Sequence, residues 1–250
     1  MIKAKKALGQ NFLKDDATAE EMVAALDLSP NDTVLEIGPG LGVLTNLLGQ
    51  HGARVIAVEL DKSLVAILQN KFRGDHRVEV VDANILDWLP SFECTNYFKV
   101  IGSLPYYITS PIIHAVIKRA RLPITCVFML QKEVAQKICA EVPDASYLST
   151  FVQTFYEADF LRVVDRKMFD PIPKVDGGIV RLTYRSAAPF NTFEEKRKYE
   201  GFLHKGFANP RKMINKAFSK EELAKSKIPG NVRPQNLSVD DWVSLFFNGC

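Results

Sequence analysis

Residues 33–42 read TVLEIGPGLG, a short apolar run that passes directly into three closely spaced glycines. The apolar run predicts a buried strand, and the spacing of apolar residues over 41–50 predicts a helix after it. Gly38, Gly40 and Gly42 permit a tight turn and a close approach of the backbone to a ligand. A strand that turns through glycines into a helix is typical of parallel sheets with a ligand site at that turn. This stretch therefore indicates an α/β protein.

Strands and helices of ordinary length alternate before and after this turn. We expect helices at residues 16–28, 62–72, 110–119 and 132–141, and further strands at 54–59, 78–81, 97–103, 125–130 and 178–184. Such alternation predicts a doubly wound, mostly parallel α/β sheet. In these sheets ligands bind beyond the carboxyl ends of the strands, where the strand order reverses.

Acidic residues close the two strands that follow the glycine turn. Glu59 comes about 20 residues after the glycines, which is the position that binds ribose hydroxyls in nucleotide-binding sheets. Asp82 closes the next strand and could accept a hydrogen bond from an adenine amino group. The glycine spacing departs from that of dinucleotide sites, because Val43 stands at the third glycine position. The pattern favours a nucleoside ligand, although either acid taken singly could be a solvated strand end or a helix cap.

Residues 102–107, GSLPYY, end the predicted strand 97–103. Pro105 has no N–H and stops the pairing of the strand, and it holds Leu104 in an extended conformation. We therefore expect the Leu104 carbonyl to point into a cavity beyond the strand end. The Ser103 hydroxyl and the ring of Tyr106 would lie beside it. Two oxygen acceptors next to an aromatic ring can hold a planar amine; the alternative is a simple turn with a tyrosine packed over it.

The composition of the chain changes near residue 186. Residues 187–250 hold 11 Lys and Arg against 7 Asp and Glu, a net charge of +4, whereas residues 1–186 hold 21 against 22, a net charge of −1. We predict a first domain over 1–186 and a small helical domain over 187–250, with helices at 192–207, 210–218, 220–226 and 240–247. The basic excess indicates an anionic partner, nucleic acid first. The candidates for contact with a nucleic-acid backbone are Lys205, Arg211, Lys212 and Lys216, and a solvated helix surface is the alternative.

Other features of the sequence exclude several classes of protein. No apolar run approaches the roughly 18 residues that a membrane-spanning helix needs, and no apolar segment follows the basic start as in a signal peptide. The four cysteines and four histidines are scattered without the spacing of metal ligands. We therefore expect a reducing, cytoplasmic setting, no membrane partner and no metal.

Over nearly its whole length the chain resembles the S-adenosylmethionine-dependent rRNA adenine N6-dimethyltransferases of the KsgA type. The matching segments are 8–13 (LGQNFL), 36–42 (EIGPGLG), 59–61 (ELD), 82–83 (DA), 104–106 (LPY), 169–176 (FDPIPKVD) and 233–238 (RPQNLS). The first and the last two are specific to this family, whereas many methyltransferases share the glycine turn. The resemblance implies a seven-stranded class I methyltransferase (Rossmann-like) sheet followed by a helical RNA-binding domain.

The resemblance also implies roles for particular residues. The cofactor S-adenosylmethionine would contact Asn11, Leu13, Gly38, Gly40, Glu59, Asp82, Ala83 and Ser103. The target adenine would be held by Ser103, Leu104 and Tyr106, with Phe169 as a second aromatic face. The implied product is N6,N6-dimethyladenosine at two adjacent adenosines in the 3′-terminal hairpin of small-subunit (16S) rRNA. The implied partner is the immature 30S subunit, and the implied oligomeric state is a monomer.

Two positions depart from the family pattern. Ser103 stands where the family usually has asparagine, and Gly177 follows Asp176 where the family tends to have serine. Two alternatives stay open. A large-subunit rRNA adenine methyltransferase of the antibiotic-resistance kind has the same core, although segment 233–238 favours the small-subunit enzyme, and Ser103 prompts the alternative of a ribosome-assembly binder with weak or vestigial catalysis. A methyltransferase of small molecules explains neither the basic C-terminal residues nor the loop with Lys174. Tyr107 is interpreted as core packing.

Overall fold

The computed structural model describes residues 4–5, 8–94 and 96–249, and its contacts divide the chain into two compact units. The first unit comprises Met1–Val116, Arg121–Ala135 and Asp159–Thr183, and the second comprises Ile117–Ala120, Gln136–Ala158 and Tyr184–Cys250, each taken over its described residues. The last segment of the second unit begins at Tyr184, close to the predicted boundary between residues 186 and 187. The two earlier segments of that unit carry no signal in the sequence, and the functions predicted for the two domains stay predictions.

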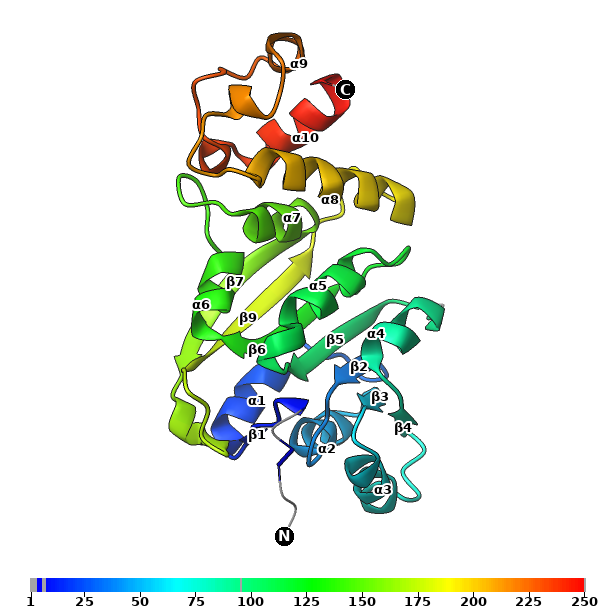
Figure 1. Ribbon diagram of the computed structural model, residues 1–250. Helices are drawn as coiled ribbons and strands as arrows, with labels where there is room; N and C mark the ends of the chain where they lie inside the picture. Colours follow the sequence, from blue (N-terminus) through cyan, green and yellow to red (C-terminus); the bar gives the residue numbers. More distant parts are fainter. Residues whose placement is uncertain (1–3, 6–7, 95, 250) are drawn as a thin grey trace. The chain divides into compact units, whose positions relative to one another are not determined.

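A seven-stranded sheet forms the centre of the first unit (Figure 1). Its strand order is β4-β3-β2-β5-β6-β9-β7. The strands are β2 (Thr33–Ile37), β3 (Arg54–Glu59), β4 (Val78–Asp82), β5 (Phe98–Ser103), β6 (Thr125–Gln131), β7 (Tyr156–Val164) and β9 (Gly177–Tyr184). Strands β2 to β6 pair in parallel, and β9 runs antiparallel to β6. The predicted mostly parallel α/β sheet is thus confirmed.

Strand order reverses between β2 and β5. From β2 the chain adds β3 and then β4 on one side, and it returns to place β5 on the other side of β2. Ligands of open α/β sheets bind at such a reversal, beyond the carboxyl ends of the strands. The glycine turn, Glu59 and the residues after Ser103 all lie at this edge of the sheet, because each follows or closes one of these parallel strands.

Most helices of the first unit lie where the sequence predicts them. The helices are α1 (Asp16–Ala24), α2 (Val43–Gln50), α3 (Lys62–Lys71), α4 (Ile85–Trp88), α5 (Thr109–Ile117) and the start of α6 (Lys132–Ile138), with short 3-10 turns at Leu89–Ser91, Tyr106–Ile108 and Arg166–Met168. Helix α4 and the short 3-10 turns were not predicted. Asp15 caps α1 by accepting a hydrogen bond from the Thr18 amide at 2.9 Å. A separate two-stranded ribbon pairs β1 (Phe12–Leu13) with β8 (Phe169–Asp170) in antiparallel fashion.

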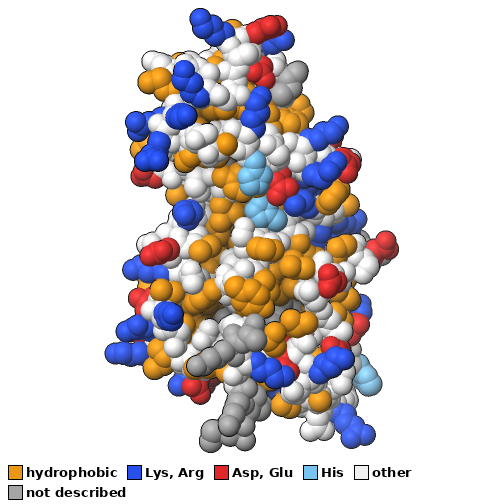
Figure 2. Space-filling model, viewed as in Figure 1, with side chains coloured by type: hydrophobic (Ala, Val, Ile, Leu, Met, Phe, Trp, Pro, Cys, Tyr) orange, Lys and Arg blue, Asp and Glu red, His pale blue; other side chains and the backbone are white. Residues whose placement is uncertain are grey.

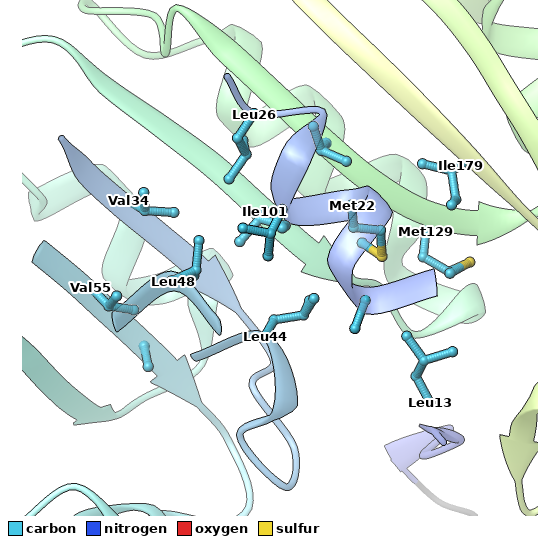
Figure 3. Packing of buried hydrophobic residues seen from close by; sticks show 14 of the residues in the cluster. Leu13, Met22, Leu26, Val34, Leu44, Leu48, Val55, Ile101, Met129 and Ile179 are labelled. Carbon is cyan, nitrogen blue, oxygen red and sulfur yellow. The ribbon is translucent and has the colours of Figure 1, made fainter. Parts of the chain in front are cut away.

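Apolar side chains from α1 and α2 pack onto the sheet to form the core of the first unit. Figure 3 shows Leu44 and Leu48 of α2 and Met22 of α1 facing strand residues such as Val34 and Ile101. All five side chains are buried. Burial of one such side chain contributes about 1.5–3 kcal/mol to folding, so this layer holds the strand ends at the ligand edge in place.

Helices and aromatic side chains build the second unit. It contains α7 (Tyr147–Phe155), α8 (Phe193–Phe207), α9 (Lys220–Lys225) and α10 (Val239–Gly249), and 3-10 turns at Ile214–Lys216 and Pro234–Asn236. Trp242 is fully buried and stacks on Phe207 with ring centroids 5.0 Å apart. The ring leaves no room for a side chain at position 206, because a Cβ on Gly206 would lie 2.2 Å from the indole.

The helix predicted at 210–218 is wrong, since the structure has only the 3-10 turn at Ile214–Lys216 there. Met213 is extended, with a ψ of 151°, and this ends any helix before it. The amide of Ile214 then donates to the Val232 carbonyl at 2.8 Å, and that of Asn215 donates to Gly230 at 3.3 Å. A long-range pairing between two loops therefore replaces local helical hydrogen bonds.

Candidate active site

A pocket opens at the point where the strand order reverses, and its walls come from the ends of β2, β3, β4 and β5 and from the N-terminal segment 8–13. Most of the residues predicted to bind a cofactor or substrate line it: Asn11, Leu13, Gly38, Gly40, Glu59, Ala83, Ser103, Leu104, Tyr106 and Phe169. These residues lie far apart in the sequence. The structure brings them to one cavity within the first unit.

The glycine turn between β2 and α2 lines the pocket through Gly38, Pro39, Gly40 and Leu41. Gly38, Gly40 and Gly42 all have left-handed backbone conformations, with φ of 67°, 59° and 72°. A Cβ on Gly42 would also lie 2.8 Å from a methyl carbon of Leu68, whereas a Cβ on Gly38 would meet nothing within 4 Å. Gly42 therefore permits close packing of α3, and Gly38 leaves open space beside the pocket.

Glu59 joins the end of β3 to the glycine turn. Its carboxylate accepts hydrogen bonds from the amide of Gly40 at 3.2 Å and from the amide of Asp61 at 2.8 Å. The residue is only 6% exposed, and burial raises the pKa of its carboxyl although these hydrogen bonds oppose the shift. A carboxylate fixed in this way at a strand end can accept hydrogen bonds from a ribose.

A network centred on Asp61 fastens the N-terminal segment beside the pocket. Asp61 accepts hydrogen bonds from Lys5 Nζ at 2.6 Å and from Gln10 Nε2 at 2.9 Å. It also caps α3 by accepting a hydrogen bond from the Ser63 amide at 3.0 Å. Burial raises the pKa of Asp61, but the hydrogen bonds from Lys5, Gln10 and Ser63 outweigh it and hold the pKa at about 2. No role was predicted for Asp61 from the sequence, although its place two positions after Glu59, in the segment 59–61, is a signal.

The end of β4 contributes to the pocket through the residues after Asp82. Asp82 itself is exposed and is absent from the described residues that line the cavity, so its predicted contact with a cofactor stays a prediction. Ala83, Asn84 and Ile85 line the wall instead. The Asn84 side chain caps α4 by accepting a hydrogen bond from the Leu86 amide at 3.1 Å, which fixes this corner.

Residues 103–106 cross the pocket between β5 and the following helix. The Leu104 amide donates to the Met129 carbonyl at 3.0 Å, so the strand is held by β6 up to the proline. The glycine before this segment is needed, because a Cβ on Gly102 would lie 2.6 Å from the Ile37 carbonyl oxygen. Tyr106 is half-buried, and burial, followed by the charge of Asp176, raises the pKa of its hydroxyl.

The interpretation of Tyr107 as a residue packed in the core is wrong. Its side chain is 57% exposed and contributes to the wall of the pocket. Phe169, in contrast, is 2% exposed and reaches the pocket from β8. Gly177 lies close to that ring, because a Cβ at this position would stand 3.5 Å from Phe169 and 3.0 Å from the sulfur of Met129.

Glu36 is a buried acid for which the sequence predicts no role. It lies within β2, is 1% exposed, and its Oε2 accepts a hydrogen bond from the Thr45 hydroxyl at 2.6 Å. Its Oε1 has no hydrogen-bond partner among the described residues. Burial raises the pKa of this carboxyl to about 7, with the Thr45 hydrogen bond opposing the shift. The position of Glu36 inside an apolar strand is the signal that could have found it.

The four basic residues predicted to bind RNA belong to the second unit and differ in their surroundings. Arg211, Lys212 and Lys216 are exposed. Lys205 is also exposed, but its ammonium lies 3.4 Å from a carboxylate oxygen of Glu222 and 4.4 Å from the ring centroid of Phe218. Figure 2 shows Lys and Arg side chains scattered over the visible surface of this unit, among uncharged and hydrophobic ones. RNA binding by these residues stays a prediction.

The described residues contain neither a membrane-spanning helix nor a cluster of metal ligands. No helix among them is both long enough and apolar enough to cross a membrane. No three or more of their His, Cys, Asp and Glu side chains gather in a way that could hold a metal ion.

The parallel sheet with its reversed strand order, the glycine turn and the acid that closes the next strand define a class I methyltransferase. More narrowly, the chain belongs to the ribosomal RNA adenine dimethylase family, whose model matches residues 1–248. Enzymes of this family use S-adenosylmethionine. The family resemblance expected from the sequence is thus confirmed.

Individual relatives agree with this assignment. The ribosomal RNA small subunit methyltransferase A of Mycoplasma capricolum is 35% identical, over 98% of this chain and 97% of its own length. Among solved structures, the 23S rRNA methyltransferase ErmE is 29% identical with a TM-score of 0.75, over 94% of this chain and 98% of its own. A dimethyladenosine transferase from Plasmodium falciparum is 25% identical with a TM-score of 0.79, over 94% and 95%.

Proposed function

We propose that this protein transfers methyl groups from S-adenosylmethionine to N6 of two adjacent adenosines in the 3′-terminal hairpin of small-subunit rRNA. The observation that carries the proposal is that the glycine turn, Glu59, residues 103–106 and Phe169 line one pocket. Relatives that bear the name small subunit methyltransferase A match the chain over nearly its full length, which supports the choice of subunit.

The pocket suits the cofactor. Gly38 leaves open space where a side chain would project, and the Glu59 carboxylate is already fixed at the strand end that faces the ribose in this class of sheet. Asn11 and Leu13 would contact the cofactor from the N-terminal wall. When bound, S-adenosylmethionine supplies a methyl group made electrophilic by its sulfonium charge. Alignment of the acceptor nitrogen with that methyl group is then the main requirement for transfer.

The acceptor amine of adenine is a weak nucleophile, because its lone pair is delocalised into the ring. Oxygen acceptors at Ser103 and at the Leu104 carbonyl would bind its two hydrogens and favour a pyramidal nitrogen that points toward the methyl group. The base must leave its stack to reach the pocket, and Tyr106 and Phe169 would supply the aromatic faces that receive it. Single-stranded or hairpin RNA suits this kind of recognition.

RNA backbone contacts are proposed for the exposed cations Arg211, Lys212 and Lys216, with a smaller contribution from Lys205 because Glu222 already neutralises part of its charge. We also propose that the protein is a monomer and that it acts in the cytoplasm on the immature 30S subunit. The proposed reaction requires no metal ion.

Two other functions have specific observations in their favour. The likeness to ErmE favours large-subunit rRNA as a substrate, and Ser103 favours an assembly factor with weak catalysis. Incubation of the protein with labelled S-adenosylmethionine and with purified immature small and large subunits separates the three. Label on adenosines of the small subunit supports the proposal. Label on the large subunit supports the first alternative, and cofactor binding without any label supports the second.

A further inference from the structure

Tyr107 occupies an unusual position for a large aromatic residue. It follows Tyr106 directly in the 3-10 turn Tyr106–Ile108, at the carboxyl edge of the sheet. Both tyrosines line the pocket, yet Tyr106 is half-buried while Tyr107 is 57% exposed. The outer ring therefore belongs to the mouth of the cavity, with more than half of its surface open to a partner.

The ring of Tyr107 is held in place by the N-terminal wall. Its Cδ1 and Cε1 carbons lie 3.0 and 3.1 Å from the position that a Cβ on Gly9 would occupy. Gly9 also has a left-handed backbone, with a φ of 62°, so the chain is shaped here to accommodate the ring. An exposed aromatic ring that is fixed in this way loses little conformational freedom when a flat ligand stacks on it.

We propose that Tyr107 forms a stacking subsite for the nucleobase adjacent to the target adenosine. The inference rests on the proposed function, because a base removed from its stack exposes the face of its neighbour. Tyr106 and Phe169 line the pocket and are half-buried and buried, whereas the exposed Tyr107 can receive a second base that stays outside. Aromatic rings stack on any base, so the subsite takes RNA of either purine or pyrimidine sequence at this position.

The test compares Tyr107→Ala, Tyr107→Phe and the control Tyr97→Ala. Tyr97 is the same type of residue and is 73% exposed, but it precedes β5 and so lies at the opposite, amino edge of the sheet. We expect Tyr107→Ala to raise KM for the RNA about tenfold, as expected for the loss of one base stack. Tyr107→Phe and Tyr97→Ala should both keep the KM of the wild-type protein.

A second measurement separates stacking from other roles of the ring. An RNA hairpin with 2-aminopurine next to the target adenosine should fluoresce less when bound to the wild type or to Tyr107→Phe than when bound to Tyr107→Ala. This readout needs binding alone, so it stays informative if the RNA is bound but not methylated. An unchanged KM for Tyr107→Ala, a loss with Tyr107→Phe equal to that with Ala, or equal 2-aminopurine signals for all variants would overturn the proposal.

Discussion

The side chain of Gln10 donates a hydrogen bond to Asp61 at 2.9 Å, which ties the N-terminal wall of the pocket to the end of β3. Lys5 strengthens the tie through its ion pair with Asp61, with Nζ and Oδ1 2.6 Å apart. The Asp61 amide in turn donates to Glu59, the acid expected to bind ribose. The position of the wall and that of the ribose acid are therefore coupled through one aspartate.

Asp61→Asn should weaken binding of S-adenosylmethionine about fivefold. Asparagine caps a helix as well as aspartate does, so α3 is kept, but the ion pair with Lys5 is lost. Lys5 is half-exposed, so the pair contributes only about 1 kcal/mol. Titration calorimetry with the cofactor measures the effect, and Asp75→Asn, which breaks the surface pair with Arg77, is the matched control. Equal affinities for both variants would contradict the coupling.

Glu36 should make the free energy of unfolding fall as pH rises from about 4.5 to about 7. The folded state raises the pKa of this carboxyl from 4.5 to about 7, so it binds one more proton than the unfolded chain in this window. The stabilisation lost by the end of the window is up to about 3 kcal/mol. Glu36→Gln should make the free energy of unfolding depend less on pH. Above pH 7 the variant should be more stable than the wild type, because glutamine resembles the protonated form of the carboxyl.

Urea unfolding at several pH values measures this slope. Glu79→Gln, an exposed residue of β4, is the control and should leave the curve of the wild-type protein unchanged. Parallel curves for Glu36→Gln and the wild type would show that Glu36 does not hold its proton in the folded state.

Two glycines of the same turn should respond differently to alanine. Gly42→Ala should lower the free energy of unfolding by about 2–4 kcal/mol, because the new Cβ combines a left-handed backbone with a contact of 2.8 Å to Leu68. Gly38→Ala meets open space and should cost only about 1–2 kcal/mol, but it should weaken cofactor binding at least tenfold. Unfolding and cofactor titration together distinguish the two, and normal cofactor affinity of Gly38→Ala would contradict its place beside the ligand.

The exposed pair Arg211 and Lys212 should control the salt dependence of RNA binding. Replacing both with glutamine should reduce the slope of log affinity against log salt by about 1.5, since each phosphate contact contributes about 0.7–0.9. Lys205→Gln should change the slope less, because its ammonium already lies 3.4 Å from Glu222. Binding is measured with an RNA hairpin over a series of salt concentrations, and an unchanged slope for the double variant would exclude these residues from the interface.

Ser103 should be an adequate replacement for the asparagine of the family. Ser103→Ala removes one oxygen acceptor from the target amine and should lower kcat about tenfold, equivalent to about 1.4 kcal/mol of transition-state stabilisation. Ser103→Asn keeps an oxygen acceptor, so its kcat should equal or exceed that of the wild type. Single-turnover methylation of one RNA substrate compares the three proteins. Equal rates for all three proteins would mean that the Leu104 carbonyl and the aromatic rings suffice to position the target amine.

The elements that local pattern controls could be predicted from the sequence. The strand over residues 33–37, the glycine turn and Glu59 follow from short-range periodicity and spacing, and together they indicated the sheet and the edge that binds ligand. The predicted helix at 210–218 failed because pairing with residues 230–232 outweighs local helical preference.

Features that depend on long-range packing could not be predicted. The burial of Glu36 against Thr45, the contact between Gly9 and Tyr107 and the bond from Gln10 to Asp61 each join parts of the chain that only the fold brings together. Asp82 illustrates the same limit at a single position. Its place at a strand end was correct, but the local path of the chain puts Ala83 and Asn84 on the pocket wall.

Methylation of immature small subunits by the purified protein, followed by digestion of the rRNA to nucleosides and fragments, tests the proposed function as a whole. We expect N6,N6-dimethyladenosine at two adjacent positions of the 3′-terminal hairpin, and none in large subunits treated in the same way. Dimethyladenosine in the large subunit alone, or no methylation of either subunit by protein that binds S-adenosylmethionine, would contradict it.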